Sequence, residues 1–178
     1  MPGDRKDFLL MVFGGITLDP TTKMPIVVLK DPDNKLNLPI WVGPLEAHAM
    51  AVEWEGAKPP RPMTHDLLRT VLGEFGATVE CIEVTDLRDN TYFAQIQLRT
   101  KDGRALTLDS RPSDALALAL RTKSPIYVAK KVLETSSELE SNADQQPPSQ
   151  QQNLAGVSRD KWSEILERMS PDDFKYKM

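Results

Sequence analysis

The chain has 178 residues, a formal net charge of −4 and one cysteine. This length suits a single domain with a short appendage, and the 40% hydrophobic content is sufficient for a buried core. No stretch approaches the roughly 20 apolar residues of a membrane-spanning helix, so a membrane protein is excluded. The acidic balance excludes a broadly basic, histone-like nucleic-acid binder. Because the N-terminal apolar run is too short for a signal-peptide core, we expect a cytoplasmic protein.

The N-terminal part of the chain predicts three strands and a helix. An apolar run at Phe8–Phe13 predicts a strand, and the Gly14-Gly15 pair allows a bulge before the strand continues. Two further strands are expected where short apolar stretches lie between turn residues: Ile26–Leu29 and Leu36–Val42. The Gly43-Pro44 pair then predicts the start of a helix that ends near Trp54, because proline is favoured in the first helical turn.

A second helix is expected after a proline-rich loop, with Thr64 as its cap. Its apolar residues recur at helical spacing and predict one buried face: Leu67, Leu68, Val71, Leu72 and Phe75. The next segment predicts a meander of three strands: Ala77–Leu87, Tyr92–Thr100 and Arg104–Asp109. Asp102-Gly103 is a hairpin turn signal between the last two of these strands.

A third helix and a last strand complete the main region. The helix begins at Arg111-Pro112 and is apolar nearly all round, which predicts burial on most of its sides. Ser124-Pro125 ends this helix, and Ile126–Val128 is a strand. The order of elements predicts an α+β fold with a mixed, largely antiparallel sheet and helices packed against it.

The composition divides the chain into three parts. Residues 1–135 contain most of the aliphatic side chains and form the expected domain. Residues 136–157 are rich in Gln, Ser and Pro and predict a flexible linker, because they have little to bury. Residues 158–178 predict a short amphipathic tail helix that docks on its own domain or on a sister subunit, with apolar residues at helical spacing: Trp162, Ile165, Leu166 and Met169.

Two Arg-Pro motifs, each at the start of a helix, carry most of the polar residues of interest. The candidate catalytic residues are His65, Asp66, Arg61 and Arg111. Histidine can transfer a proton near neutral pH, and the two arginines can hold phosphate oxygens in a bidentate manner. We expect Asp66 to orient His65 or to cap its helix.

Two carboxylates near the second motif are candidate metal ligands. Asp109 ends a strand and Asp114 begins the following helix, so the two can hold Mg²⁺ or Mn²⁺. With the histidine and the arginines, they are the parts of a phosphodiester-cleaving site. The same residues also have a structural interpretation, in which the acids complement helix dipoles and pair with the arginines. The residues alone leave both interpretations open.

Four segments resemble the bifunctional nuclease domain family, formerly a domain of unknown function: LPIWVGPLEAHAMA, RPMTHDLL, DNTYFAQIQL and LDSRPSDALALALR. The resemblance covers about residues 8–135. The family takes its name from the DNase and RNase activity of a plant member, so the resemblance implies a metal-assisted nuclease that acts on RNA or DNA. Besides the candidate residues above, Glu46, Thr64 and Ser113 occupy positions within the matching motifs.

Two other functions stay open at this point. One is a non-enzymatic, oligomeric ligand-binding or regulatory module, whose Arg, Asp and His residues bind a small anion or are structural; the other is an oligomeric scaffold. We expect a homodimer or another homo-oligomer, because the first strand is apolar on both faces and the third helix on most sides. The net charge of −4 counts against nucleic-acid binding, unless basic residues share one face: Lys58, Arg61, Arg69, Arg121, Lys123, Lys130 and Lys131.

Overall fold

The computed structural model describes residues 5–143 of the chain, which form one sheet with helices packed on it. The strands are β1 (Phe8–Leu18), β2 (Pro25–Lys30), β3 (Asn37–Trp41), β4 (Thr78–Arg88), β5 (Thr91–Arg99), β6 (Ala105–Ser110) and β7 (Ile126–Ala129). The helices are α1 (Pro44–Trp54), α2 (Thr64–Glu74), α3 (Pro112–Thr122) and α4 (Lys130–Ala143). In this part of the chain, no helix is long and apolar enough to cross a membrane.

The sheet is mixed and largely antiparallel, and the predicted α+β fold is confirmed. Its strand order is β3-β2-β1-β7-β4-β5-β6. Each pair of neighbouring strands in it is antiparallel apart from β4 and β7, which are parallel. Strand β7, which comes last in sequence among the described strands, therefore lies in the middle of the sheet, between β1 and β4.

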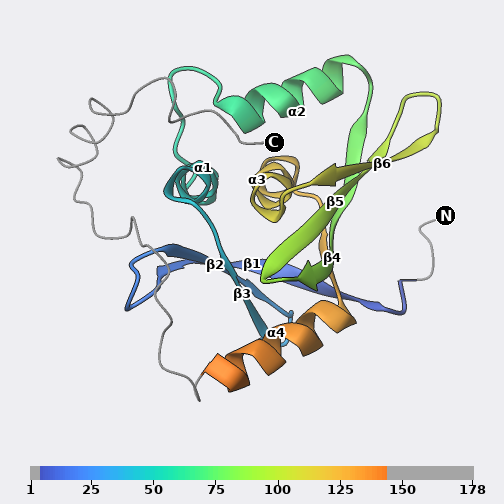
Figure 1. Cartoon of the computed structure of the whole chain (residues 1–178). Coiled ribbons are helices and arrows are strands. Elements are labelled where there is room, and N and C mark those ends of the chain that lie inside the picture. Colours follow the sequence, from blue (N-terminus) through green and yellow to red (C-terminus); the bar gives the residue numbers. More distant parts are fainter. Residues whose placement is uncertain (1–4, 144–178) are drawn as a thin grey trace, which may run out of the picture.

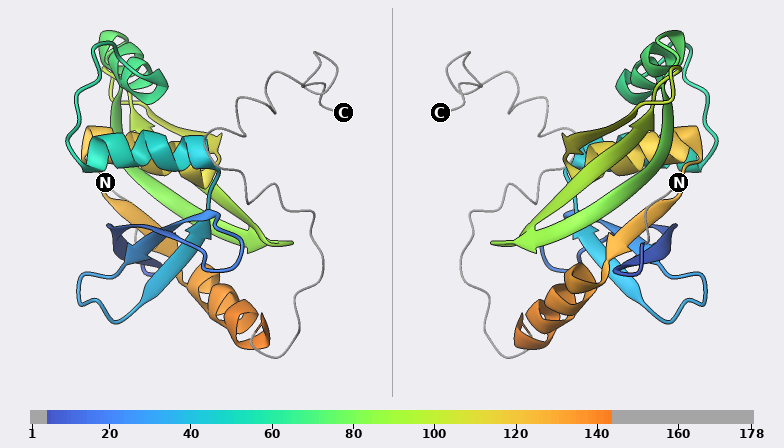
Figure 2. Two further views of the ribbon diagram at one scale, coloured as in Figure 1. Left: turned by 90° about the vertical axis from the view of Figure 1, so that its left-hand side faces the viewer. Right: turned by 90° about the vertical axis from the view of Figure 1, so that its right-hand side faces the viewer.

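Strand β1 belongs to both halves of the sheet and changes partner midway. Its first residues pair with β7 as far as Met11, and its later residues pair with β2 from Val12 onward. The predicted bulge is present between Phe13 and Gly15, where the register shifts. Gly15 has a φ of 126°, a conformation that L side chains rarely adopt. The half formed by β1–β3 consequently runs at a steep angle to β4–β6 (Figures 1 and 2).

Helix α3 lies at the centre of the molecule, as its sequence predicts. Its residues from Ala115 to Ala119 are all buried. Helix α1 runs alongside α3, and α2 lies across them (Figures 1 and 2). The sheet covers the remaining side of α3, where Ile82, Val84 and Ile96 belong to the same core. Because α3 is covered by its own chain, it gives no reason to expect a second subunit.

A buried guanidinium ties the three helices together. Arg121 of α3 is 3% exposed and donates from Nε to Asp66 Oδ1 of α2, at 2.6 Å. Its Nη2 donates to the Ala49 carbonyl of α1, and its Nη1 to the Ala117 carbonyl of α3. Burial raises the pKa of Asp66, but the Met63 amide and Arg121 outweigh this effect and leave that pKa below its ordinary value. Asp66 is therefore an ionised partner for Arg121 at neutral pH.

The start of α2 differs by one residue from the prediction. Met63 is the N-cap, whereas Thr64 is the first helical residue. The Met63 amide donates to Asp66 Oδ2 at 2.9 Å, so the carboxylate three residues downstream satisfies the free N–H at the helix start. The expectation that Asp66 caps its helix is thus confirmed, and the expectation that Thr64 is the cap was wrong.

Helix α4 was not predicted, and it corrects the boundary of the expected linker. Residues 136–143 were assigned to the flexible linker, but α4 continues through them to Ala143. Val132 is fully buried, and the Ser136 hydroxyl is within hydrogen-bonding distance, 3.2 Å, of the Tyr92 hydroxyl. A few such contacts with the domain stabilise a segment whose own composition is that of a linker. The rest of the expected linker and the predicted tail helix at 158–178 lie outside the described residues.

Replacing Val132 by Ala should lower the free energy of unfolding by about 2 kcal/mol, because it removes fully buried methyl groups. Urea denaturation measures this change. Glu134→Ala, on an exposed position of the same helix, should stay within about 0.5 kcal/mol of the wild type. Equal destabilisation by both substitutions would show that α4 does not depend on this contact.

Asp66→Asn should destabilise the fold by about 3 kcal/mol, because it leaves the buried charge of Arg121 without its counter-ion. The pKa of Asp66 is lowered by folding, so its stabilisation is present above its ordinary pKa of about 4 and is lost as pH falls through the folded value. The difference between wild type and variant should therefore shrink in denaturation series below about pH 4. Asp33→Asn, in an exposed pair with Lys35, is the matched control and should have little effect.

Candidate functional site

Three helix starts bring four polar side chains into contact, and we call these residues the Arg111 cluster: Glu46, His65, Arg111 and Asp114. Arg111 donates to both carboxylate oxygens of Asp114, from Nε at 2.7 Å and from Nη2 at 3.1 Å. Its Nη1 donates to Glu46 Oε1 at 3.1 Å. His65 Nε2 lies 3.3 Å from Asp114 Oδ1. The cluster thus joins the beginnings of α1, α2 and α3.

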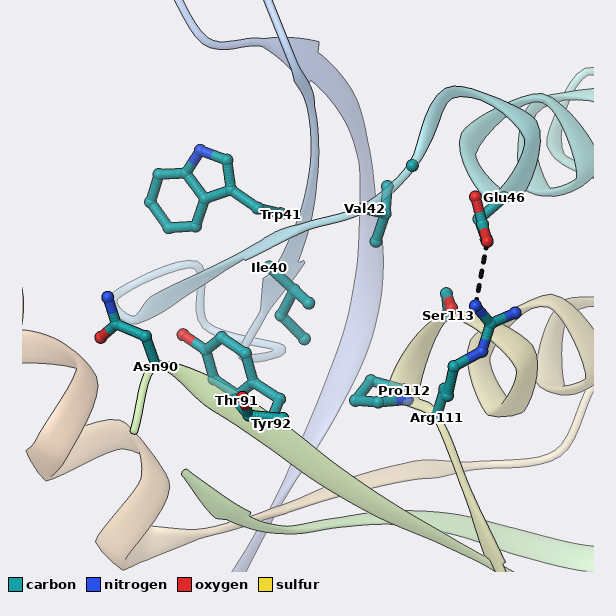
Figure 3. A pocket seen from close by; sticks show the side chains of 11 residues that line it. Ile40, Trp41, Val42, Glu46, Asn90, Thr91, Tyr92, Arg111, Pro112 and Ser113 are labelled. Carbon is teal, nitrogen blue, oxygen red and sulfur yellow. Dashed lines mark hydrogen bonds and ion pairs between the residues drawn. The ribbon is translucent and has the colours of Figure 1, made fainter. Parts of the chain in front are cut away.

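The local sequence explains why these side chains converge. Pro44 and Pro112 occupy the first turns of α1 and α3, so both helices start at fixed points. A Cβ atom at position 43 would collide with the Glu46 carboxylate. Gly43 therefore allows this carboxylate to fold back over the start of α1, where the helix dipole favours negative charge. Figure 3 shows Glu46 turned toward Arg111.

The charges of the cluster determine which atom donates in the hydrogen bond between His65 and Asp114. The Arg111 guanidinium holds the pKa of Asp114 below its ordinary value, against the opposing effect of burial, and His65 lowers it further. Asp114 is therefore ionised at neutral pH and can only accept hydrogen bonds. Its partner nitrogen, His65 Nε2, then carries the proton, and Nδ1 is left as the basic nitrogen of the neutral ring.

A cavity of about 290 Å³ opens beside the cluster. Arg111 and Glu46 lie on one wall, and Trp41 and Tyr92 lie on the opposite wall (Figure 3). The side chain of Arg111 is 65% exposed, and Trp41 is also largely exposed. A guanidinium and an indole ring across one cavity can hold the phosphate and the base of a nucleotide, respectively.

The structure brings together three of the six predicted site residues. His65, Arg111 and Asp114 belong to the cluster, whereas Arg61 lines a second cavity. Asp66 lies next to His65 in sequence, but its carboxylate pairs with Arg121 and does not orient the histidine. Asp114 performs that task instead.

The predicted pair of metal ligands is separated by the sheet. Asp109 of β6 pairs with Gln95 of β5, so its side chain lies on the face opposite to Ala94 and Ile96, which belong to the core. Asp114 lies on the core side, at the start of α3. Among the residues that the structure describes, no group of three or more His, Cys, Asp or Glu side chains could hold a metal ion. Asp109 and Asp114 therefore do not form one shared site, and the binding of Mg²⁺ or Mn²⁺ stays a prediction.

Two features of the site were not predicted as functional. Glu46 was placed in a matching motif, but its pairing with Arg111 joins residues far apart in the chain. Trp41 carried a usable signal, because it ends a strand just before a helix start and alternates with the buried Ile40 and Val42. An exposed tryptophan at such a position is a stronger indication of binding than an exposed aliphatic residue.

The sequence of this chain was compared with protein families and with known proteins. A family model described as the bifunctional nuclease domain matches residues 27–141. The chain is 35% identical over 164 residues to an uncharacterized protein of Mycobacterium tuberculosis, covering 90% of this chain and 94% of the relative.

Plant relatives match a shorter part of the chain. Bifunctional nuclease 1 of Arabidopsis thaliana is 34% identical over 110 residues, covering 60% of this chain and 34% of the plant protein. Bifunctional nuclease 1 of Oryza sativa subsp. japonica is 27% identical over 109 residues, covering 60% of this chain and 33% of the rice protein. The chain therefore spans about a third of the length of these plant relatives. With the family model covering more than half of its length, the chain belongs to the bifunctional nuclease domain family.

Proposed function

We propose that the protein is a nuclease that cleaves single-stranded RNA or DNA at the Arg111 cluster. The observation that carries this proposal is the contact between His65 and the ionised Asp114, beside an exposed arginine at the edge of a cavity. The membership of the family and the names of its plant relatives support a nucleic-acid substrate. The cytoplasmic location stays a prediction.

In this mechanism, His65 is the proton-transfer group. As the oxygen of an attacking water forms its bond to phosphorus, Nδ1 takes the proton of that water. The ester bond on the other side of the phosphorus breaks, the departing oxygen takes a proton from solvent, and the imidazolium returns its proton to solvent after cleavage. Asp114 accepts the hydrogen bond from Nε2 throughout and stabilises the charged ring.

Arg111 is the phosphate-binding group of this mechanism. Of its five N–H groups, three donate to Asp114 and Glu46. The two that remain can donate to phosphate oxygens, where negative charge grows as the bond to phosphorus forms. The need for Mg²⁺ or Mn²⁺ stays a prediction, and no step above depends on it.

A non-enzymatic binding module is the second candidate, and one observation favours it. Arg111 already has two carboxylate partners. A cluster of this kind can bind a small anion, or stabilise the convergence of three helices, without any bond being cleaved.

Cleavage of labelled single-stranded oligonucleotides by rigorously repurified protein tests the proposal. His65→Ala should lower the rate by roughly 10²- to 10⁴-fold, the usual contribution of a proton-transfer group, and Asp114→Asn should also lower it. His48→Ala is the matched control, because the chain has two histidines and His48 is exposed on α1. Parallel assays with Mg²⁺, Mn²⁺ or EDTA test the metal requirement.

The outcomes separate the two candidate functions. Equal cleavage by wild type and all variants would point to a contaminating nuclease and reject the site. Absence of cleavage by folded wild-type protein, with nucleotide binding retained, would favour the binding module. Circular dichroism and denaturation confirm that each variant is folded.

We also propose that the protein is a homodimer whose contact surface is helix α2. This helix faces its own domain mainly with polar side chains, because His65, Asp66 and Arg69 contact α3, and of its predicted apolar face only Leu72 packs against the core. Its apolar side points outward, and none of its residues is buried. The predicted buried face is therefore largely exposed: Leu67, Leu68, Val71 and Phe75.

The spacing of this exposed face suits a second copy of the same helix. Leu67 and Phe75 each lie four residues from Val71, so they flank it on one side of the helix. A two-fold axis through Val71 would place Phe75 of one subunit on Leu67 of the other. Such self-complementary contacts are the rule in symmetric dimers.

Analytical ultracentrifugation at micromolar concentration should give a dimer for the wild type. The double substitution Leu67→Glu and Val71→Glu should give a monomer, because it places charges in the apolar contact. Leu45→Glu is the matched control on an exposed leucine of α1 and should leave the dimer intact. A monomeric wild type would overturn the dimer. If Phe75 is shielded from solvent in the full chain but not in a chain that lacks residues 158–178, those residues cover this face instead of a second subunit.

A further inference from the structure

A second cavity of about 290 Å³ lies at the other end of α1. It is formed by the end of α1, the loop that follows and the start of α2. Three cationic side chains line it: Lys58, Arg61 and Arg69. All three are exposed, so their charges are accessible from solvent. In a chain of net charge −4, this is a local concentration of positive charge.

The carboxylates near this cavity do not neutralise it. Asp66 also lines the cavity, but it pairs with the buried Arg121. Glu53 is the other acid in the lining. Within residues 5–143, no carboxylate lies within ion-pair distance of Lys58 or Arg61. The lining therefore has a positive balance and lacks internal partners for two of its cations.

The loop that carries these cations is stiff. Lys58 and Arg61 are each followed by proline in the sequence Lys-Pro-Pro-Arg-Pro, at positions 58–62. Each proline ring fixes the backbone φ of its own residue, and it restricts the residue that precedes it. Positioning the two cations therefore costs less conformational entropy on binding than in a loop without prolines.

We propose that this cavity is a phosphate-binding subsite for single-stranded nucleic acid, separate from the Arg111 cluster. The inference rests on the proposed nuclease function for the identity of its ligand. Lysine and arginine at an open cavity match the phosphodiester backbone, which carries a charge at each nucleotide and no sequence information. The subsite would therefore bind strands of any sequence.

Its position relative to the Arg111 cluster suits one continuous strand. Glu46 lies in the first turn of α1 and Glu53 lies near its end, so the two places are separated by about 10 Å of helix at 1.5 Å per residue. On the other side, the segment from Arg61 to His65 leads directly from the cavity to the cluster. A few nucleotides can span this separation, so the subsite would hold the strand while the cluster acts on it.

The salt dependence of oligonucleotide binding tests this subsite. The probes are fluorescein-labelled oligo(dT) and oligo(rU), whose affinity is measured by anisotropy over a series of salt concentrations. For single strands, each phosphate contact contributes about −0.7 to the slope of log K against log salt. The double substitution Lys58→Gln and Arg61→Gln should thus reduce the slope by about 1.4, equally for both probes.

The control substitutions are Lys35→Gln and Lys130→Gln, on exposed lysines of the β2–β3 turn and of α4. They should leave the slope unchanged. An unchanged slope in the Lys58/Arg61 variant, or no oligonucleotide binding by the wild type, would overturn the subsite. Binding of millimolar inorganic phosphate without salt-dependent binding of the oligonucleotides would also overturn the subsite. The cavity would then be a site for free phosphate.

Binding measurements in the His65→Ala background keep this inference separate from the proposed nuclease. Cleavage that depends on His65, together with an unchanged slope, would retain the nuclease and reject the subsite. A reduced slope in the Lys58/Arg61 variant without cleavage by any protein would retain the subsite and reject the nuclease.

Discussion

The buried guanidinium of Arg121 is the constraint on which the arrangement of the helices depends. A charge removed from water is tolerated only when its hydrogen bonds and its counter-ion are supplied by the protein. Arg121 meets this requirement with Asp66 of α2 and with the carbonyls of Ala49 and Ala117. Any displacement of α1 or α2 relative to α3 would leave part of the guanidinium unsatisfied. The position of α2 is therefore determined by polar contacts more than by apolar packing.

This constraint also positions the candidate site. Asp66 and His65 are neighbours in α2. The ion pair between Asp66 and Arg121 therefore also positions His65 within hydrogen-bonding distance of Asp114. The stabilising ion pair and the candidate catalytic contact thus lie one residue apart, on the same turn. A substitution in either pair can change stability and activity together. Kinetic effects at this turn therefore have to be compared with the unfolding free energy of the same variant.

The sequence predicted those parts of the fold that follow from local patterns. Alternating side chains indicated the strands, the Gly14-Gly15 pair indicated the bulge, and the nearly all-apolar α3 indicated a central helix. Helix α4 was missed because its stability comes from tertiary contacts such as that of Val132. For the site, motif position identified Arg111, His65 and Asp114, but the face on which Asp109 lies depends on the register of β6 with β5. Register is a pairing between distant segments, which composition and spacing do not contain.

The central place of β7 has a consequence for how the chain folds during synthesis. Among the strands of residues 5–143, β7 is synthesised last, yet it joins the half-sheet of β1–β3 to that of β4–β6. Until residue 129 has emerged, each half can form hairpins with its sequence neighbours, but β1 and β4 present unpaired edges to the cell. Pairing of the two half-sheets through β7 is therefore available only after residue 129 has been synthesised. Insertion of one short strand between them is a late, long-range step, of the kind that limits folding rates.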